Sequence, residues 1–212
     1  MDSLAERLPP RQRLALAYAR KPLRAAWLFI LALDATLGAT LRAAREPMLV
    51  QIRLAWWREQ VASGSSPFRD REPLLALQSG WPGDAARLVA LVDAWEGVSA
   101  PAPLPAGAMA DLADARARVM AAVAADDPAS LAMARAWSLA DLAAHLGDAG
   151  ERETALALAQ AADWQARRLP VGMRPLAVLH ALALRDMRQN RFAAGVTPAG
   201  LLTAIRVGMV GW

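Results

Sequence analysis

Hydrophobic residues recur along most of the chain at the three-to-four-residue spacing of amphipathic helices, and prolines and glycines divide this pattern into segments of ordinary helical length. Residues 128–146 show it clearly, with Leu131, Trp137 and Leu142 on a broad apolar face. No run alternates Val, Ile or Thr as a strand would. The pattern predicts an all-α fold with helices over residues 11–19, 22–43, 47–62, 72–78, 84–97, 107–125, 128–146, 150–168, 173–190 and 198–208.

Two of these helix starts carry explicit signals. Asp127 precedes Pro128 and Thr197 precedes Pro198, so each pair offers a side-chain cap followed by a proline in the first turn. The proline-rich stretch 99–105 is too short to be an interdomain linker. We therefore expect the 212 residues to form one helical domain, 1–212.

Composition excludes some classes of site. The chain has no cysteine, which rules out disulfides and thiolate metal sites, and His145 and His180 lie too far apart for a histidine zinc motif. The net charge is +4, and residues 11–24 carry five basic side chains and no acid. This basic stretch could meet anionic lipid, a diphosphate or an acidic partner, or it could be a solvated helix end. We expect no nucleic-acid partner.

Residues 25–41 are apolar apart from Asp34, Thr36 and Thr40. The span is short for a bilayer, which needs about 20 residues, and it carries a charge near its centre. It therefore predicts a buried core helix. An unpaired carboxylate would be expensive there, so Asp34 either faces a polar cavity or pairs with an arginine from another helix, and we favour pairing.

Residues 24–59 carry the most specific pattern. Arg24 leads the apolar helix, and Glu46-Pro47-Met48 precedes Trp56-Trp57-Arg58. This resembles the squalene/phytoene synthase family, in which an arginine leads an apolar helix that ends in Asp-x-x-x-Asp and a tryptophan-rich helix follows. Aligned without gaps from Arg24, the two aspartate positions fall on Gly38 and Arg42.

Further family positions are also changed. The tyrosine and arginine that precede the first aspartate fall on Leu31 and Ala35, and the region of the second motif offers Asp141 and Asp148, which are seven residues apart. Carboxylates four residues apart on one helix face can share Mg²⁺ with a substrate diphosphate, and no Asp in the chain is followed by another four residues later. Asp141 and His145, one turn apart, suit either an acid that orients an imidazole or a surface or capping role.

The resemblance covers residues 11–63 well and 128–191 loosely, and it is strongest toward a divergent branch that includes complex I assembly-factor proteins. It implies an isoprenoid-synthase-type helical bundle around a central cavity. It also implies a non-catalytic assembly or scaffolding factor, cytoplasmic or peripheral to the inner membrane, with a protein partner, no catalytic residue, no metal and no cofactor.

Two alternatives stay open. One is a prenyltransferase that condenses isoprenoid diphosphates, either with Mg²⁺ or with Arg24, Arg42, Arg53 and Arg58 binding the diphosphate in its place. The other is a carrier of an isoprenoid or other lipid. Both tryptophans of the pair could lie in the core, or one of them could lie in a pocket or on a partner-binding surface. Arg53 could stack on Trp57. The candidate ligand- or partner-binding residues are Arg24, Asp34, Arg53, Trp56, Trp57 and Arg58.

Overall fold

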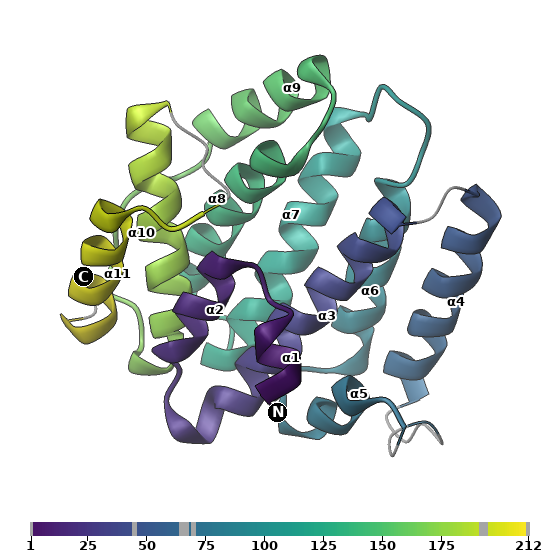
Figure 1. The fold of residues 1–212 in the computed structure, drawn as a ribbon, viewed down its shortest axis with the longest axis horizontal. Helices are drawn as coiled ribbons and strands as arrows, with labels where there is room; N and C mark the ends of the chain where they lie inside the picture. The colour runs from purple at the N-terminus through teal and green to yellow at the C-terminus, as the bar shows by residue number, and fades with distance from the viewer. Residues whose placement is uncertain (1, 44–45, 64–67, 69–70, 191–194, 211–212) are drawn as a thin grey trace.

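The structure, a computed structural model, describes residues 2–43, 46–63, 68, 71–190 and 195–210. Within these ranges the chain is built from helices and contains no strand, so the all-α prediction is confirmed (Figure 1). The α-helices are α1 (Asp2–Glu6), α2 (Pro10–Ala17), α3 (Arg24–Ala43), α4 (Pro47–Ser63), α5 (Pro73–Leu77), α6 (Ala85–Gly97), α7 (Ala106–Ala121), α8 (Pro128–His145), α9 (Ala149–Gln160), α10 (Arg174–Gln189) and α11 (Pro198–Val210).

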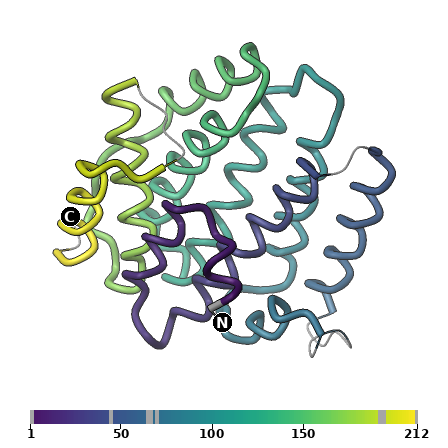
Figure 2. The backbone as a smooth tube through the Cα atoms, viewed as in Figure 1, coloured from purple at the N-terminus to yellow at the C-terminus, as the bar shows by residue number. Residues whose placement is uncertain are grey.

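Six helices contact one another in the order α4, α6, α7, α8, α10 and α11, and α3 packs against this row (Figures 1 and 2). Helix α3 also contacts α1, α2 and α5. Twelve of its residues, from Ala26 to Thr40, are buried. Among the described helices the segment Lys21–Ala43 is long and apolar enough to cross a membrane, but most of it is enclosed by the protein. It is therefore a core helix, as its central charge predicted.

The helix ends follow local capping chemistry. Asp127 accepts a hydrogen bond from the Ser130 amide at 2.8 Å, and Thr197 accepts one from the Gly200 amide at 3.1 Å. Both predicted caps are therefore confirmed. The predicted helix 150–168 is wrong beyond residue 160. There the Asp163 carboxylate accepts from the Gln165 amide at 2.9 Å, and a side chain that satisfies nearby amides in this way competes with helix.

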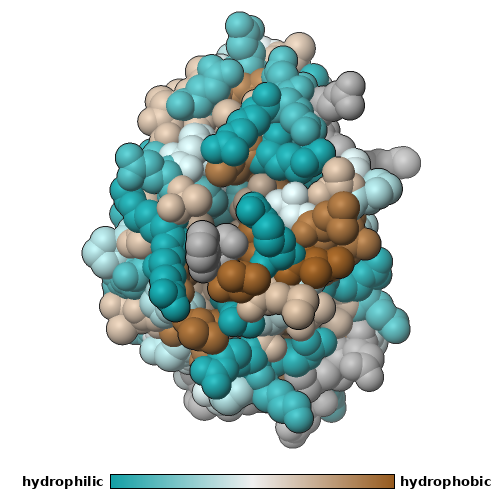
Figure 3. Space-filling view, turned by 90° about the vertical axis from the view of Figure 1, so that its left-hand side faces the viewer, coloured by the Kyte–Doolittle hydropathy of each residue, from teal (hydrophilic) through white to brown (hydrophobic). Residues whose placement is uncertain are grey.

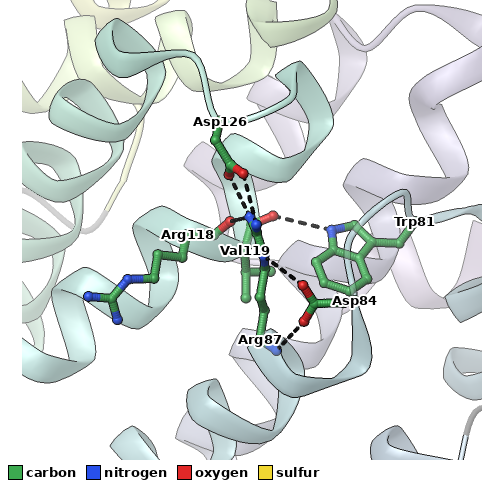
Figure 4. A network of polar contacts seen from close by, with 6 residues as sticks. All are labelled: Trp81, Asp84, Arg87, Arg118, Val119 and Asp126. Atoms are coloured by element: carbon green, nitrogen blue, oxygen red, sulfur yellow. Dashed lines mark hydrogen bonds and ion pairs between the residues drawn. The ribbon is translucent and has the colours of Figure 1, made fainter.

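An arginine at the start of α6 ties three segments together (Figure 4). The Arg87 guanidinium donates to both carboxylate oxygens of Asp126, at 2.5 and 2.8 Å, and pairs with Asp84 at 3.3 Å. Asp126 has a φ of 61°, a left-handed conformation unusual for a residue other than glycine. The bidentate pair lowers the pKa of Asp126 and holds the turn between α7 and α8 against α6.

The tryptophan pair of α4 lies partly in the core. Trp57 is 6% exposed, and Trp56 is half-buried with its ring edge-on to that of Trp57, 4.9 Å between centroids. Arg53 is exposed and makes no cation–π contact with any described residue, so it does not stack on Trp57. Trp57 is therefore a core residue, whereas Trp56 is partly accessible to solvent.

We expect Trp57→Ala to lower the free energy of unfolding by about 3–5 kcal/mol, because it removes a large buried ring. Ile52→Ala on the same helix is the matched control: Ile52 is 58% exposed, and its loss should change stability by about 0.5 kcal/mol or less. Urea unfolding measures both. Equal stability of Trp57→Ala and wild type would show that the ring is not buried in solution.

Candidate functional site

Arg116 of α7 lies between the carboxylates of two other helices. Its Nε donates to Asp34 Oδ1 of α3 at 2.8 Å, and its Nη1 donates to Asp141 Oδ2 of α8 at 3.1 Å. Arg116 is 5% exposed and Asp34 is 3% exposed. The pairing favoured for Asp34, with an arginine from another helix, is confirmed. We call Asp34, Arg116 and Asp141 the buried triad.

Two tryptophan rings enclose the guanidinium. Its central carbon lies 5.0 Å from the ring centroid of Trp95 and 5.8 Å from that of Trp137. The indole Nε1 of Trp95 also donates to Asp34 Oδ1 at 2.9 Å, so this oxygen accepts two hydrogen bonds. Aromatic faces attract a cation, most strongly where water is excluded. The rings and carboxylates around the guanidinium come from four helices, α3, α6, α7 and α8. Together they partly offset the cost of burying its charge.

The charge balance of the triad favours the ionised arginine. Burial acts to lower the pKa of Arg116, but the charges of Asp34 and Asp141 act in the opposite direction and raise the pKa above its ordinary value. A buried guanidinium is stable only when carboxylates pair with it and its N–H groups have acceptors. Both carboxylates are therefore committed to Arg116 in the folded protein.

A small cavity of about 60 Å³ adjoins the triad. Ala35, Gly38 and Arg42 line it. Gly38 and Arg42 are the two positions that align with aspartates in the squalene/phytoene synthase pattern. A Cβ placed on Gly38 would lie 2.9 Å from Cη2 of Trp95, so the indole fills the space of a side chain at this position. Arg42 is exposed at the mouth and pairs with no carboxylate of the described residues.

The donor set does not fit a magnesium site. Mg²⁺ needs oxygen ligands in octahedral geometry, held by carboxylates that are free to bind it. Here Asp34 and Asp141 are bound to a guanidinium, Gly38 offers no ligand, and Arg42 adds a second cation. The described residues contain no group of three or more His, Asp or Glu side chains arranged to hold a metal ion.

His145 also lines the cavity, at the end of α8. Its Nδ1 lies 2.7 Å from the backbone carbonyl oxygen of Asp141 and 3.6 Å from the Asp141 carboxylate. A carbonyl oxygen can only accept, so Nδ1 donates to it and caps the last turn of the helix. Of the two interpretations of this pair, the structure favours the capping role.

The other candidate residues do not converge on the cavity. The Arg24 guanidinium donates to the Leu16 carbonyl oxygen at 3.0 Å, where it joins α3 to α2. Arg58 donates to Asp93 of α6 at 2.6 Å and also pairs with Glu96, whose hydrogen bond is the main reason that the pKa of Arg58 is raised. Among the candidates, Asp34 and Arg42 meet at one site, and Arg24, Arg53, Trp56, Trp57 and Arg58 lie elsewhere.

The basic stretch 11–24 is also divided by the fold. Arg11 pairs with Asp186 of α10 at 2.5 Å, and Arg24 is bound to a carbonyl group, whereas Arg13, Arg20 and Lys21 are exposed. Two of its five cations therefore stabilise contacts between helices. The remaining three are exposed to solvent.

Arg116 was not anticipated from the sequence, although a signal for it exists. Met109, Leu112, Ala113, Val119 and Met120 form the buried face of α7, and position 116 falls on that face by helical spacing. A charged residue on an apolar face calls for a buried partner, as Asp34 did. Sequence spacing alone, however, does not say which carboxylates meet it.

Comparison of the chain with family models, with curated proteins and with solved structures finds no significant match. The buried triad therefore has to be interpreted from its own chemistry.

We expect Arg116→Met to destabilise the protein by about 3–5 kcal/mol, because it leaves the buried Asp34 and the partly buried Asp141 without their counter-charge. Adding Asp34→Asn and Asp141→Asn removes those charges and should recover at least half of the loss. The control is Arg135→Met, which breaks the half-exposed pair with Asp114 and should change stability by about 1 kcal/mol or less. Urea unfolding of the four proteins measures this. A triple variant no more stable than Arg116→Met would contradict the electrostatic role of the triad.

Proposed function

We propose that the protein is a squalene/phytoene synthase-like helical protein without catalytic activity, which acts as an assembly or scaffolding factor near a membrane. The observation that carries the proposal is the Arg116 guanidinium between the carboxylates of α3 and α8. Carboxylates that are held by an arginine cannot also assemble Mg²⁺ around a diphosphate. The isoprenoid-synthase-type architecture is part of the proposal and rests on the resemblance of residues 11–63.

Exposed apolar side chains support a role in binding. On α4, Met48 is 70% exposed and Ile52 is 58% exposed, and their four-residue spacing places both on the same helix face as the half-buried Trp56. On α11, Leu202 and Met209 are 69% and 66% exposed. Clusters of large apolar side chains on a protein surface often mark the places where the protein contacts a partner or a membrane.

The prenyltransferase alternative has less support. In the version without Mg²⁺, Arg24, Arg42, Arg53 and Arg58 would have to bind a diphosphate together. Arg24 and Arg58, however, are engaged in contacts between helices. Arg53 lies on α4, whereas Arg42 lies on α3. Arg42 alone of the four lines the cavity by the triad. That cavity, about 60 Å³, is also far below the 300–1,000 Å³ typical of ligand sites.

We expect no head-to-head prenyl transfer. Incubation of the protein with farnesyl or geranylgeranyl diphosphate and Mg²⁺ should give no C30 or C40 hydrocarbon, because the carboxylates needed to hold the metal are replaced or paired. Product analysis by chromatography and mass spectrometry checks this against a heat-denatured sample. Steady turnover above that background would overturn the proposal and favour the enzyme.

The scaffolding part is tested by affinity capture from native cells, followed by mass spectrometry. The wild type should recover a specific protein partner, and Met48→Asp/Ile52→Asp, which places charges on the exposed face of α4, should lose it. Arg13→Gln/Arg20→Gln, which changes two exposed arginines outside α4, is the control and should retain it. Identical recovery with all three proteins would argue against α4 as the binding face.

A further inference from the structure

A second cavity lies away from the buried triad, between α10, α11 and the segment 161–170. Its volume is about 360 Å³, within the range typical of small-molecule sites. Figure 3 looks onto this side of the molecule, where hydrophilic and hydrophobic side chains lie next to one another. The cavity borders no residue of the triad, so it is a separate candidate site.

Four arginines line this cavity: Arg167, Arg185, Arg188 and Arg206. Arg167 is balanced by Asp163, to which it donates at 2.6 Å. The other three pair with no carboxylate of the described residues, and no Asp or Glu is among the residues that line the cavity. Three uncompensated guanidiniums around one hollow attract a multiply charged anion.

Helical spacing brings these arginines onto the faces of α10 and α11 that line the cavity. Ala177, His180, Ala181, Leu184, Arg185 and Arg188 recur every three or four residues along α10 and so lie on one face. Thr203, Arg206 and Val207 have the same spacing on α11, which packs against α10. Ala177, Ala181, Leu184 and Val207 give both faces an apolar part, and Arg188 and Arg206 are exposed.

A buried histidine gives an independent sign of a missing ligand. His180 lines the cavity and is 1% exposed, and its Nε2 has no hydrogen-bond partner in the described structure. The ring stacks on Trp164, 5.2 Å between centroids. Burial lowers the pKa of His180 to about 4, against a weaker opposing effect of Asp163. A buried polar atom without a partner is rare and marks a ligand, a water molecule or a functional group.

We propose that this cavity binds the head group of a phosphate ester, with Arg185, Arg188, Arg206 and His180 around the phosphate and the apolar walls around the attached carbon chain. A phosphate monoester carries about −1.5 to −2 charges near neutral pH. Guanidinium forks match its oxygens in pairs, and a neutral imidazole can donate one further hydrogen bond. A carboxylate, with one negative charge, would leave more of the arginine charge uncompensated.

The test uses hexyl phosphate, inorganic phosphate and vesicles of equal parts phosphatidylcholine and phosphatidic acid. Calorimetry should show that the wild type binds hexyl phosphate more tightly than inorganic phosphate, because the apolar walls contact the chain. Arg188→Gln/Arg206→Gln should weaken binding by about tenfold or more, since it removes two charged donors. Both arginines are exposed, so the core of this variant is unchanged.

Two controls separate the cavity from general positive charge. Arg13→Gln/Arg20→Gln removes the same charge from two exposed arginines that do not line the cavity, and it should bind like wild type. Ala181→Phe keeps all four arginines but fills the cavity, and it should abolish binding. In NMR spectra of the wild type, hexyl phosphate should raise the pKa of His180, because an adjacent anion stabilises the imidazolium.

The vesicle arm identifies the source of the phosphate. Sedimentation with phosphatidic acid vesicles that depends on Arg188 and Arg206 would assign the site to a phospholipid, and binding of hexyl phosphate alone would assign it to a soluble ester. Either result supports the proposal. Equal binding by the two double-glutamine variants, an unchanged His180 pKa on ligand addition, or no binding of any phosphate ester would overturn it.

Discussion

The guanidinium of Arg116 lies where α3, α7 and α8 meet. Its positive charge on α7 faces one negative charge on α3 and one on α8. Asp34 of α3 and Asp141 of α8 each accept a hydrogen bond from it, and Trp95 of α6 donates a further hydrogen bond to Asp34. Neither Asp34 nor Arg116 could stay buried alone, because an unpaired ion in the interior costs several kcal/mol. The position and rotation of α3, α7 and α8 are therefore coupled through one side chain.

The same coupling gives positions 38 and 42 a structural context. With glycine at position 38, the indole of Trp95 can approach α3 closely enough to bind Asp34 and to cover the guanidinium. An aspartate at 38 would collide with that indole, and a carboxylate at 42 would replace a cation at the mouth of the cavity. Gly38, Trp95 and the triad form one packed and paired arrangement, which supports our proposal of a protein without catalysis.

Much of the helical fold follows from local chemistry that can be read from the sequence. Proline and capping residues set the starts of α8 and α11, and apolar spacing set α3 and α10. The end of α9 could not be predicted in this way, because helix propensity continues past residue 160 and the competing hydrogen bond comes from Asp163. The short helix α1 was likewise missed, since its five residues carry no strong periodicity.

The candidate site was predictable only in part. A charge within an apolar helix identified Asp34 as a residue in need of a partner, and the family pattern identified Gly38 and Arg42. The partner Arg116 is 82 residues away in the chain, and the choice among the chain's many arginines is made by tertiary packing. For the same reason the arginines at the α10–α11 cavity are ordinary surface charges in the sequence and form a cluster only in the fold.

The central claim is that a guanidinium occupies the place between Asp34 and Asp141 and so prevents a divalent cation from binding there. Calorimetric titration of MgCl₂ into the wild type, Arg116→Ala and Arg116→Ala/Asp34→Asn tests it most directly, with thermal unfolding of the same samples as a check on folding. We expect no binding to the wild type at millimolar Mg²⁺. Arg116→Ala should bind Mg²⁺ weakly and melt at a higher temperature in its presence, and the Asp34→Asn double variant should lose both effects. Binding of Mg²⁺ to the wild type at these concentrations, or a folded Arg116→Ala that binds no Mg²⁺, would contradict the claim.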